Sequence, residues 1–324
     1  MSESAFRPPS GLTIAGAERD TGLSKDTLRA WERRYGFPEP MRDAAGERVY
    51  PADQIDKLRI LKRLVDVGHR PRHVVALSLD ALQRLAQEST ALQTPAPTME
   101  GHGRSLSDLD TCLDRLRHHD VDGLRRHLRQ SGARLGLAAL VTEVIAPLNT
   151  RVGEAWMRGQ LEIFEEHLYT ELVQSTLRQA IEALPPAGSL ASPRALLTTC
   201  PGEPHGLGLL MAEAMLALEG ARCVSLGVAT PVWDIVLAAK ALQCDIVALS
   251  FTGCMNPNHV VDALTELRSK LPAHVDVWAG GAAPALHRRP VPGVKPLATF
   301  GELRAELQDW RTRSERGATA STRP

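Results

Sequence analysis

The 324-residue sequence has few cysteines, and none of them forms a Cys-x-x-Cys pair. This spacing excludes the usual patterns of a disulfide framework and of a zinc site. We therefore expect the cysteines to be small, mostly buried residues. They are Cys112, Cys200, Cys223, Cys244 and Cys254.

The sequence also lacks a long apolar run, a signal peptide and an excess of charge. No apolar run approaches the roughly 18 residues of a membrane span, and the first residues lack the basic and apolar regions of a secretory signal. We expect a cytoplasmic protein without a membrane partner. The 38 Lys and Arg balance the 38 Asp and Glu, so a nucleic-acid site has to gather its basic residues locally. The length predicts two or three domains.

Short amphipathic segments separated by tight turns occupy residues 11–88. Ser24 is placed to cap a helix that runs to about Tyr35. Leu28 and Trp31 lie three residues apart on one face of that helix, so its basic residues can point away from the core. The loop after the helix is able to form a small wing. This arrangement indicates a helix-turn-helix whose second helix enters the major groove of DNA.

This helix and the loop after it resemble the signature of the MerR regulator family. The matching residues are Leu28-Arg29-x-Trp31-Glu32-x-Arg34-Tyr35-Gly36 and Gly46-x-Arg48-x-Tyr50. Between residues 24 and 72, twelve Lys and Arg outnumber eight Asp and Glu, which predicts salt-sensitive phosphate contacts; a solvated helical face is the alternative. The resemblance implies double-stranded operator DNA as a partner. It implies base or phosphate contacts from Lys25, Asp26 and Arg29, and phosphate contacts from Tyr35, Arg48 and Tyr50.

Further along the chain the composition changes twice. Residues 89–104 are rich in Ser, Thr, Pro and Gly and predict a linker. Residues 105–190 show a helical pattern of about four helices, which is typical of a small bundle. Polar stretches at 1–10 and 313–324 predict a disordered lead-in and a disordered tail.

Strand-like and helix-like segments alternate over residues 191–312. Alternation of this kind implies a parallel sheet with ligand loops at the carboxyl ends of its strands. The predicted fold is therefore multidomain, α and α/β. It combines a winged helix-turn-helix head, a four-helix bundle cap and a Rossmann-like domain.

The loop after the first strand of this domain carries His205, with Glu203 before it and Gly206 and Gly208 after it. A neutral imidazole suits a transition metal, and Glu203 is placed to accept the other ring N–H. The glycines remove side-chain bulk where a large planar ligand would sit against backbone. On its own this string is weak, and an ordinary loop histidine fits it better.

Three segments together resemble the cobalamin-binding domain family, whose pattern is Asp-x-His-x-x-Gly, then Ser-x-Leu, then Gly-Gly. The segments here are Glu203-x-His205-x-x-Gly208, Ser250-Phe251-Thr252 and Gly280-Gly281. Glu replaces Asp, and Thr replaces Leu. The resemblance implies that His205 is the axial ligand to the cobalamin cobalt and that the loop with Thr230 lies against the corrin. The nucleotide tail would lie between Ser250/Thr252 and Gly280/Gly281.

Within the bundle, Trp156 is followed ten residues later by Glu166 and then His167. An indole can cover an adenosyl group, while Glu and His can form hydrogen bonds with its sugar and base. The motif resembles that of light-responsive MerR regulators that bind cobalamin, the CarH and LitR type. Met157 stands where some relatives have a histidine able to capture cobalt, which leaves a bis-histidine photoproduct open.

The resemblance implies a cobalamin-dependent, light-responsive repressor, and not an enzyme. Its cofactor would be adenosylcobalamin, with methylcobalamin as an alternative. It would be a homo-tetramer in the dark holo state and a monomer or dimer otherwise, releasing operator DNA after Co–C photolysis.

Two other functions fit parts of the sequence. A light-independent MerR-type repressor would use its cobalamin domain as an interaction platform. A corrinoid carrier module of an enzyme would use the same Rossmann-like domain, although a winged head has no catalytic purpose there.

Overall fold

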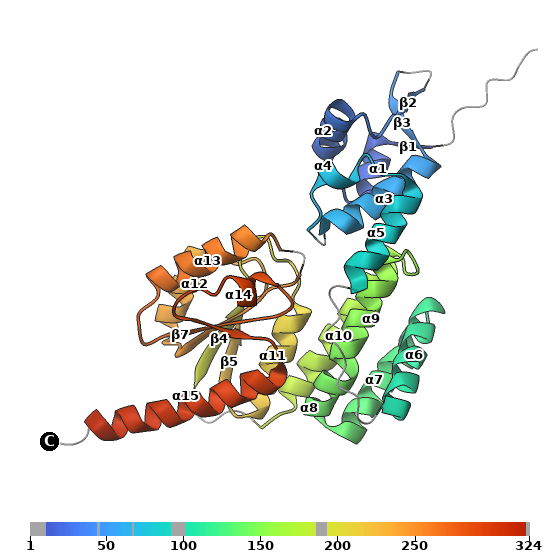
Figure 1. The fold of residues 1–324 in the computed structure, drawn as a ribbon. Coiled ribbons are helices and arrows are strands. Elements are labelled where there is room, and N and C mark those ends of the chain that lie inside the picture. Colours follow the sequence, from blue (N-terminus) through green and yellow to red (C-terminus); the bar gives the residue numbers. More distant parts are fainter. Residues whose placement is uncertain are drawn as a thin grey trace, which may run out of the picture. The chain divides into compact units, whose positions relative to one another are not determined.

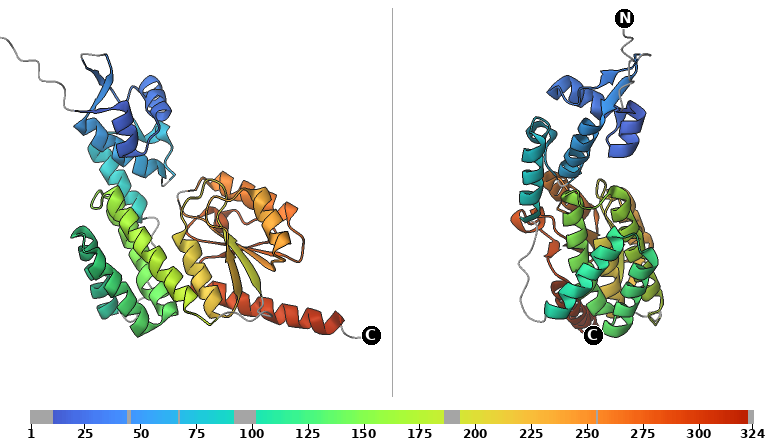
Figure 2. Two further views of the ribbon diagram at one scale, coloured as in Figure 1. Left: turned by 180° about the vertical axis from the view of Figure 1, so that it is seen from behind. Right: turned by 90° about the vertical axis from the view of Figure 1, so that its right-hand side faces the viewer.

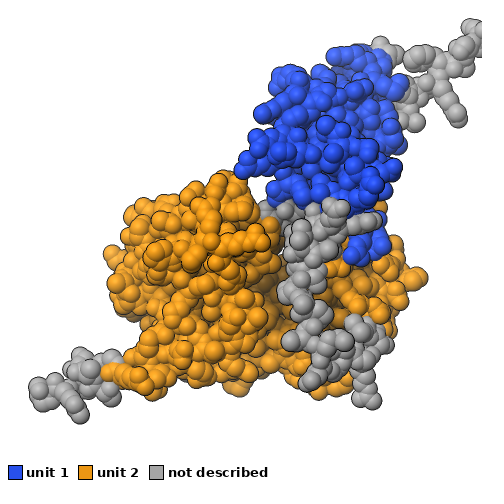
Figure 3. Space-filling model, viewed as in Figure 1, with its two compact units in different colours: residues 1–94, 157–160 blue, residues 95–156, 161–324 orange. Residues whose placement is uncertain are grey.

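A computed structural model of the chain describes residues 11–43, 46–66, 68–91, 102–185, 193–253 and 255–321 (Figure 1). It divides into two compact units (Figure 3). Unit 1 contains residues 1–94 and 157–160, and unit 2 contains residues 95–156 and 161–324. Among the helices that the structure describes, none is both long and apolar enough to cross a membrane. The predicted lead-in at 1–10 lies outside the described residues.

Unit 1 is a winged helix-turn-helix, as predicted. Its elements are β1 (Gly11–Thr13), α1 (Ile14–Thr21), α2 (Lys25–Tyr35), β2 (Met41–Arg42), β3 (Arg48–Pro51), α3 (Ala52–Asp66), α4 (Pro71–Val74) and α5 (Leu79–Ala91). The strands pair antiparallel in the order β1-β3-β2, and β2 and β3 form the wing.

Local signals set the ends of α2 and its buried face. The Ser24 side chain accepts a hydrogen bond from the Thr27 N–H at 3.1 Å, which caps the first turn. Gly36 ends the helix in the left-handed region at φ 68°, where glycine has no side-chain clash. Leu28 and Trp31 are buried in the core of unit 1, so the opposite face of α2 is left to solvent.

The helical half of unit 2 contains the four predicted bundle segments. They are α6 (His102–Arg117), α7 (Val121–Leu135), the run α8 (Leu137–Ala139), η1 (Leu140–Ile145) and α9 (Ala146–Met157), and α10 (Ile163–Glu182). The predicted linker at 89–104 is wrong at both ends, because α5 continues to Ala91 and α6 begins at His102. Residues 92–101 and 186–192 lie outside the described part of the chain.

The other half of unit 2 is a five-stranded parallel sheet with helices on both faces. Its elements are β4 (Arg194–Thr198), α11 (Leu207–Leu218), β5 (Arg222–Ser225), α12 (Val232–Ala241), β6 (Ile246–Ser250), α13 (Pro257–Lys270), β7 (Asp276–Gly280), α14 (Ala285–Arg288), β8 (Val294–Leu297) and α15 (Phe300–Ser321). The strand order is β5-β4-β6-β7-β8, which is a doubly wound order. The predicted Rossmann-like fold is confirmed, whereas β8 and α14 were not predicted.

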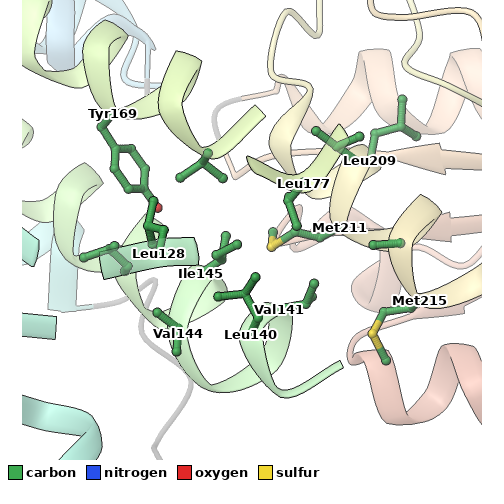
Figure 4. Close-up of a cluster of buried hydrophobic side chains, with 14 of the residues drawn as sticks. Leu128, Leu140, Val141, Val144, Ile145, Tyr169, Leu177, Leu209, Met211 and Met215 are labelled. Carbon is green, nitrogen blue, oxygen red and sulfur yellow. The ribbon is translucent and has the colours of Figure 1, made fainter. Parts of the chain in front are cut away.

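Helix α11 joins the bundle to the sheet. Its Leu209, Met211 and Met215 pack in one buried cluster with bundle residues such as Val141 and Leu177 (Figure 4). The same cluster includes residues from one face of the sheet. The bundle and the Rossmann-like domain, predicted as separate domains, therefore share one hydrophobic core. Burial of this apolar surface stabilises their relative placement.

The prediction of a disordered tail at 313–324 is wrong for the residues that the structure describes there. Helix α15 continues through these residues to Ser321, and Figure 2 shows its second half extending beyond the sheet. Leu303 and Leu307 are buried and anchor the first half. Once a helix is nucleated, each further residue adds a hydrogen bond at little cost, so the polar continuation stays helical. Residues 322–324 lie outside the described chain.

Candidate cofactor and DNA-binding sites

The predicted ligand loop lies at the point where the strand order reverses. Strands β5 and β6 lie on opposite sides of β4, so the loops after β4 and β6 diverge at this edge. Open α/β sheets bind their ligands in the crevice that such a reversal creates at the carboxyl ends of the strands. The loop after β4 carries Glu203 and His205, and the residue two positions after β6 is Thr252.

Glu203 holds the His205 ring through a short hydrogen bond. His205 Nδ1 lies 2.6 Å from Glu203 Oε1, and the His205 backbone N–H donates to the same oxygen at 3.1 Å. An ionised carboxylate only accepts hydrogen bonds, so Nδ1 carries the proton. Glu203 is fully buried, whereas the His205 side chain is 52% exposed. The imidazole therefore stands at the edge of the sheet in one tautomer.

Thr252 holds the other oxygen of the same carboxylate. Its backbone N–H and its hydroxyl each donate to Glu203 Oε2 at 2.7 Å. Burial alone would raise the pKa of the Glu203 carboxyl, but the hydrogen bonds from His205 and Thr252 outweigh burial and hold this pKa below its usual value. The carboxylate is therefore ionised at neutral pH despite its burial.

Two threonines at the end of β4 brace the ligand loop against the loop after β5. The Thr199 hydroxyl donates to the Glu203 carbonyl at 2.6 Å and accepts from the Ala229 N–H at 2.7 Å. The Thr198 and Thr230 hydroxyls lie 2.7 Å apart. Thr230, predicted to bind the cofactor, thus has its hydroxyl engaged inside the protein. The sequence analysis did not single out Thr198 and Thr199. Two hydroxyl side chains directly before the ligand loop were the available signal for this role.

Glycines let the backbone segments approach closely around the predicted nucleotide-tail site. A Cβ on Gly208 would lie 2.8 Å from Ser250 Oγ, and one on Gly281 would lie 2.2 Å from the Phe251 carbonyl oxygen. Gly281 also has φ 105°, which side chains rarely adopt. The structure therefore brings Gly208, Ser250 and the Gly280-Gly281 pair to the same edge as His205.

The predicted upper-face residues lie on the bundle. Trp156 is half-buried against the shared core near the end of α9. Glu166 lies in the first turn of α10, which a capping box between Glu162 and Glu165 begins, and His167 follows it. Glu166 Oε2 lies 2.7 Å from His167 Nδ1, and its Oε1 accepts from the Thr170 hydroxyl at 2.7 Å. These hydrogen bonds orient both polar side chains from within α10.

In unit 1, the residues predicted to contact DNA from α2 lie on its solvent side. The Asp26 side chain is 94% exposed, and those of Lys25 and Arg29 are each nearly half exposed. Lys25 pairs with Glu18, and Arg29 pairs with Asp26, at 3.5 Å in both cases. Exposed pairs of this length contribute little free energy, so the cations remain adaptable. Tyr35 is partly buried at the end of the helix, with the Arg34 guanidinium 5.5 Å from its ring centroid.

Arg48 braces the wing against α2. Its Nε and Nη2 donate to the two oxygens of Glu32 at 3.0 and 3.3 Å. The hydrogen bond and the charge of Glu32 raise the pKa of the Arg48 guanidinium. A bidentate pair fixes both side chains in one geometry. Arg48 therefore sets the position of the wing in addition to any contact with phosphate.

The prediction that Tyr50 contacts phosphate is wrong. Its side chain is fully buried in the core of unit 1, and within the described residues its hydroxyl has no hydrogen-bond partner. Burial raises the pKa of this phenol. The reason is its place on β3, whose Tyr50 pairs with Leu12 of β1 and faces the core helices. A buried hydroxyl cannot reach phosphate, so Tyr50 is a core residue.

A hollow on the surface of unit 2 lies away from His205. It is lined mainly by residues at the starts of β7 and β8, including Asp276 and Lys295. Three of its charged lining residues are paired: Lys295 with Glu306, and Asp276 with Arg313. None of the residues predicted to bind cobalamin lines this hollow.

Three sequence families match the chain. The family described as MerR HTH family regulatory protein matches residues 12–81. Two families described as B12 binding domain match residues 193–300 and 109–181. The first covers unit 1, and the other two cover the sheet half and the bundle half of unit 2.

Two curated relatives match most of the chain. The HTH-type transcriptional repressor CarH of Myxococcus xanthus is 34% identical over 82% of this chain and 87% of its own. The HTH-type transcriptional repressor CarA of the same organism is 31% identical over 84% of this chain and 87% of its own. Both are transcriptional repressors, in agreement with the prediction of a regulator.

A similar solved structure is that of the Methanosarcina barkeri monomethylamine corrinoid protein. It covers 63% of this chain and 98% of its own, with 17% sequence identity and a TM-score of 0.47. A similarity of this size does not bear on function.

Proposed function

This chain belongs to the MerR family of cobalamin-binding transcriptional repressors, and we propose that it uses adenosylcobalamin as a light-sensitive switch for its assembly on operator DNA. The observation that carries this proposal is the short hydrogen bond from the His205 ring to a buried carboxylate. A histidine that binds a metal through one ring nitrogen almost always donates the other N–H to such a partner.

His205 is the proposed lower axial ligand of the cobalt. Because Nδ1 carries the proton, the lone pair is on Nε2, which is the nitrogen that would bind the metal. The surrounding residues fit a large planar group. Gly206 and Gly208 present backbone and no side chain next to the histidine, and the Gly208 backbone packs closely against Ser250 of the proposed nucleotide-tail site. We assign the nucleotide-tail site to Ser250, Thr252, Gly280 and Gly281.

Trp156, Glu166 and His167 are the proposed residues for the upper ligand. When bound, adenosylcobalamin supplies a cobalt–carbon bond that light cleaves. The indole of Trp156 offers an apolar cover, and the Glu166–His167 pair offers oriented hydrogen-bonding groups to a sugar and a base. Methylcobalamin has no sugar or base for this pair to contact, which favours the adenosyl form.

Unit 1 would bind operator DNA through Lys25, Asp26, Arg29 and Tyr35 of α2 and through Arg48 of the wing. A single head offers few cationic contacts, and those on α2 are exposed and weakly paired. Several heads on one assembly gain from effective concentration, whereas a lone head does not. We therefore propose that a tetramer in the dark represses and that a monomer or dimer releases the operator.

The link between cofactor and assembly is thermodynamic. A ligand can shift an equilibrium only by its different affinity for the two states. Residues of the proposed site come from the bundle and from the sheet, which share a core through α11. Occupation of the site would add contacts between these two halves to those of the shared core, and loss of the adenosyl group would remove the added contacts.

Size-exclusion chromatography of the full chain tests the proposal. With adenosylcobalamin, the dark protein should elute as a larger species than the apo protein, and illumination should reverse the change. His205→Ala should stay small in both conditions. If the elution volume of the holo protein is the same in the dark and after illumination, light-driven disassembly is wrong.

A second experiment tests the light-independent alternative. A DNA duplex is first selected from a random pool by the holo protein, and its binding to the apo and holo proteins is then compared in the dark. A repressor that uses its cobalamin domain only as an interaction platform would bind that duplex equally with and without cofactor. The proposal expects about a hundredfold tighter binding by the holo protein, which is the lower end of typical avidity gains.

A further inference from the structure

A hydrogen bond in the core of the bundle joins α9 to α10. The Tyr169 hydroxyl of α10 donates to Asn149 Oδ1 of α9. Tyr169 is buried and projects into the shared core (Figure 4). Burial raises the pKa of this phenol well above its ordinary value, so the hydroxyl stays protonated and able to donate. Neither residue is among those predicted to bind cobalamin.

The Asn149 amide also reaches a third helix. Its Nδ2 donates to Met211 Sδ of α11 at 3.7 Å, and a thioether is a weak acceptor. Helix α11 begins at Leu207, two residues after His205. The Asn149 side chain therefore connects α9 both with α10 and with the helix that follows the ligand loop.

We infer that the hydrogen bond between Asn149 and Tyr169 positions Trp156 and Glu166 by fixing the rotation of α9 against α10. The inference rests on the proposed function, because it concerns two residues proposed to hold the upper ligand. Asn149 and Tyr169 are positioning residues and need no contact with the cofactor.

Helical spacing places each partner of this hydrogen bond in line with a residue of the proposed upper site. Trp156 follows Asn149 by seven residues, close to two turns of 3.6, so both lie on one face of α9 about 10 Å apart along its axis. Glu166 precedes Tyr169 by three residues, a spacing at which helical side chains are neighbours. A rotation of α9 about its axis would therefore change where Trp156 lies relative to Glu166.

The backbone before Asn149 does less than usual to fix this rotation. Helix α9 follows η1, a π-helical stretch whose hydrogen bonds span five residues in place of four. Pro147, the second residue of α9, has no N–H to donate, so the ladder of backbone hydrogen bonds is interrupted again. Asn149 lies two residues further on.

Apolar packing alone is a poor substitute for this hydrogen bond. Leu148 and Val152 of α9 are buried in the shared core, but the hydrophobic effect that holds them there has no preferred direction. A hydrogen bond requires a narrow range of distance and angle. The bond from Tyr169 therefore selects one rotation of α9 among those that apolar contacts would accept.

The first experiment uses the apo protein, so that no cofactor is involved. The full chain is labelled with 5-fluorotryptophan, and the Trp156 signal is identified by its absence from Trp156→Phe. Fluorine NMR should show one Trp156 signal in the wild type and a shifted or doubled signal in Tyr169→Phe, which removes only the hydroxyl.

The matched control for this experiment is Thr176→Val. Thr176 is also buried on α10, but its hydroxyl donates to the Leu172 carbonyl of the same helix. Loss of this hydroxyl leaves the bond between α9 and α10 intact. The Trp156 signal of Thr176→Val should therefore match that of the wild type.

The second experiment compares two cofactors by absorbance titration in the dark. Methylcobalamin has no sugar or base to contact Glu166, so its binding depends less on the placement of Trp156 and Glu166. Tyr169→Phe should weaken adenosylcobalamin binding about fivefold to tenfold, which matches the net contribution of one hydrogen bond. It should leave methylcobalamin binding unchanged, whereas loss of a purely structural residue would weaken both cofactors alike.

Asn149→Leu removes the acceptor and keeps a similar side-chain volume. It should give the same selective loss of adenosylcobalamin binding as Tyr169→Phe. The double variant should lose no more than either single variant, because all three break one hydrogen bond. Losses that multiply in the double variant would overturn the inference.

The outcomes separate the inference from the proposed function. If Glu166→Ala binds both cofactors as the wild type does, the proposed upper site is wrong. If Glu166→Ala loses the preference for adenosylcobalamin but Tyr169→Phe keeps it, or keeps the wild-type Trp156 signal, only the inference is overturned. Equal weakening of both cofactors in Tyr169→Phe would overturn it as well. If Tyr169→Phe does not fold, Asn149→Leu decides by the same two measurements.

Discussion

In the head, the side chains assigned to DNA extend into solvent from α2, whereas in the ligand loop the side chains assigned to cobalamin are tied to buried groups. Arg29 and Asp26 form a pair at 3.5 Å on the surface. Glu203, by contrast, is fully buried and accepts hydrogen bonds of 2.6–3.1 Å from two segments of the chain.

This difference follows from the two kinds of ligand. Attraction to phosphates acts over several ångströms and tolerates mobile cations. A metal ligand has to present one nitrogen in one orientation, and it depends on the groups around it for that. The head therefore presents exposed, adaptable charges, whereas the ligand loop is held by a network of hydrogen bonds to buried groups. The four predictions that follow test this contrast, from the largest expected effect to the smallest.

His205→Ala should have the largest effect. It removes the proposed protein ligand, so affinity for adenosylcobinamide, a corrinoid that has no nucleotide tail, should fall by more than about 100-fold, beyond the loss expected for an outer partner. Absorbance titration measures this. The unfolding of unit 1 should be unchanged, since the two units have separate cores. An unaltered affinity would show that His205 is not the ligand and that the rigid loop around it does not serve cobalt binding.

Gly281→Ala should destabilise unit 2 by about 3 kcal/mol, because the new Cβ would lie 2.2 Å from the Phe251 carbonyl oxygen and the backbone has φ 105°. Gly220→Ala is the matched control. Gly220 also has a positive φ of 79°, but a Cβ there would meet nothing within 4 Å, so the cost should be about 1 kcal/mol. Denaturant unfolding of the apo protein measures both. Equal losses would show that the ligand edge is not tightly packed.

Arg29→Ala should weaken DNA binding by about 1 kcal/mol, or roughly fivefold, and should lower the slope of log affinity against log salt by about one. Its fold and its cobalamin spectrum should not change, because Arg29 is exposed and weakly paired. Arg126→Ala, an exposed arginine of α7, is the control and should bind DNA normally. A large loss of stability in Arg29→Ala would mean that α2 is not the adaptable surface inferred here.

The smallest effect should be a loss of head stability in mild acid. Burial lowers the pKa of the His69 imidazole below its ordinary value. A depressed pKa in the folded state contributes stability that is present above the unfolded value, about 6.5, and is lost as the pH falls through the folded value. Thermal unfolding between neutral pH and pH 5 measures this, and His69→Gln should flatten the dependence. If the stability of His69→Gln depends on pH as that of the wild type does, other titrating groups cause the loss of stability in acid.

Parts of both regions were predictable because their signals are local. Ser24, Leu28, Trp31 and Gly36 lie within one helix and its caps, and together they define α2 and its buried face. Strands β4 to β7 were predictable from apolar runs at regular spacing. Strand β8 was missed because it is short and contains a proline, which weakens the strand signal. The polar end of α15 was missed because its helicity is inherited from an anchored first half.

The site shows the same division. Glu203 and His205 are two residues apart, so their hydrogen bond could be predicted from the chain alone. Tyr50 matched a DNA-binding signature, yet β3 turns its ring into the core. Thr198 and Thr199 look like ordinary strand residues until the loop after β5 is placed beside them.

The sequence by itself determined the order of strands β4 to β7 and their helices, the caps of α2, the glycine-rich loop after β4 and the family. Each of these depends on residues within a few positions of one another or on a pattern along the chain. Only the tertiary structure decided that Tyr50 is buried, that α11 gives bundle and sheet one core, and that Thr252 completes the partners of Glu203. Burial and hydrogen bonds between distant segments depend on which elements pack together, and a linear sequence does not state that.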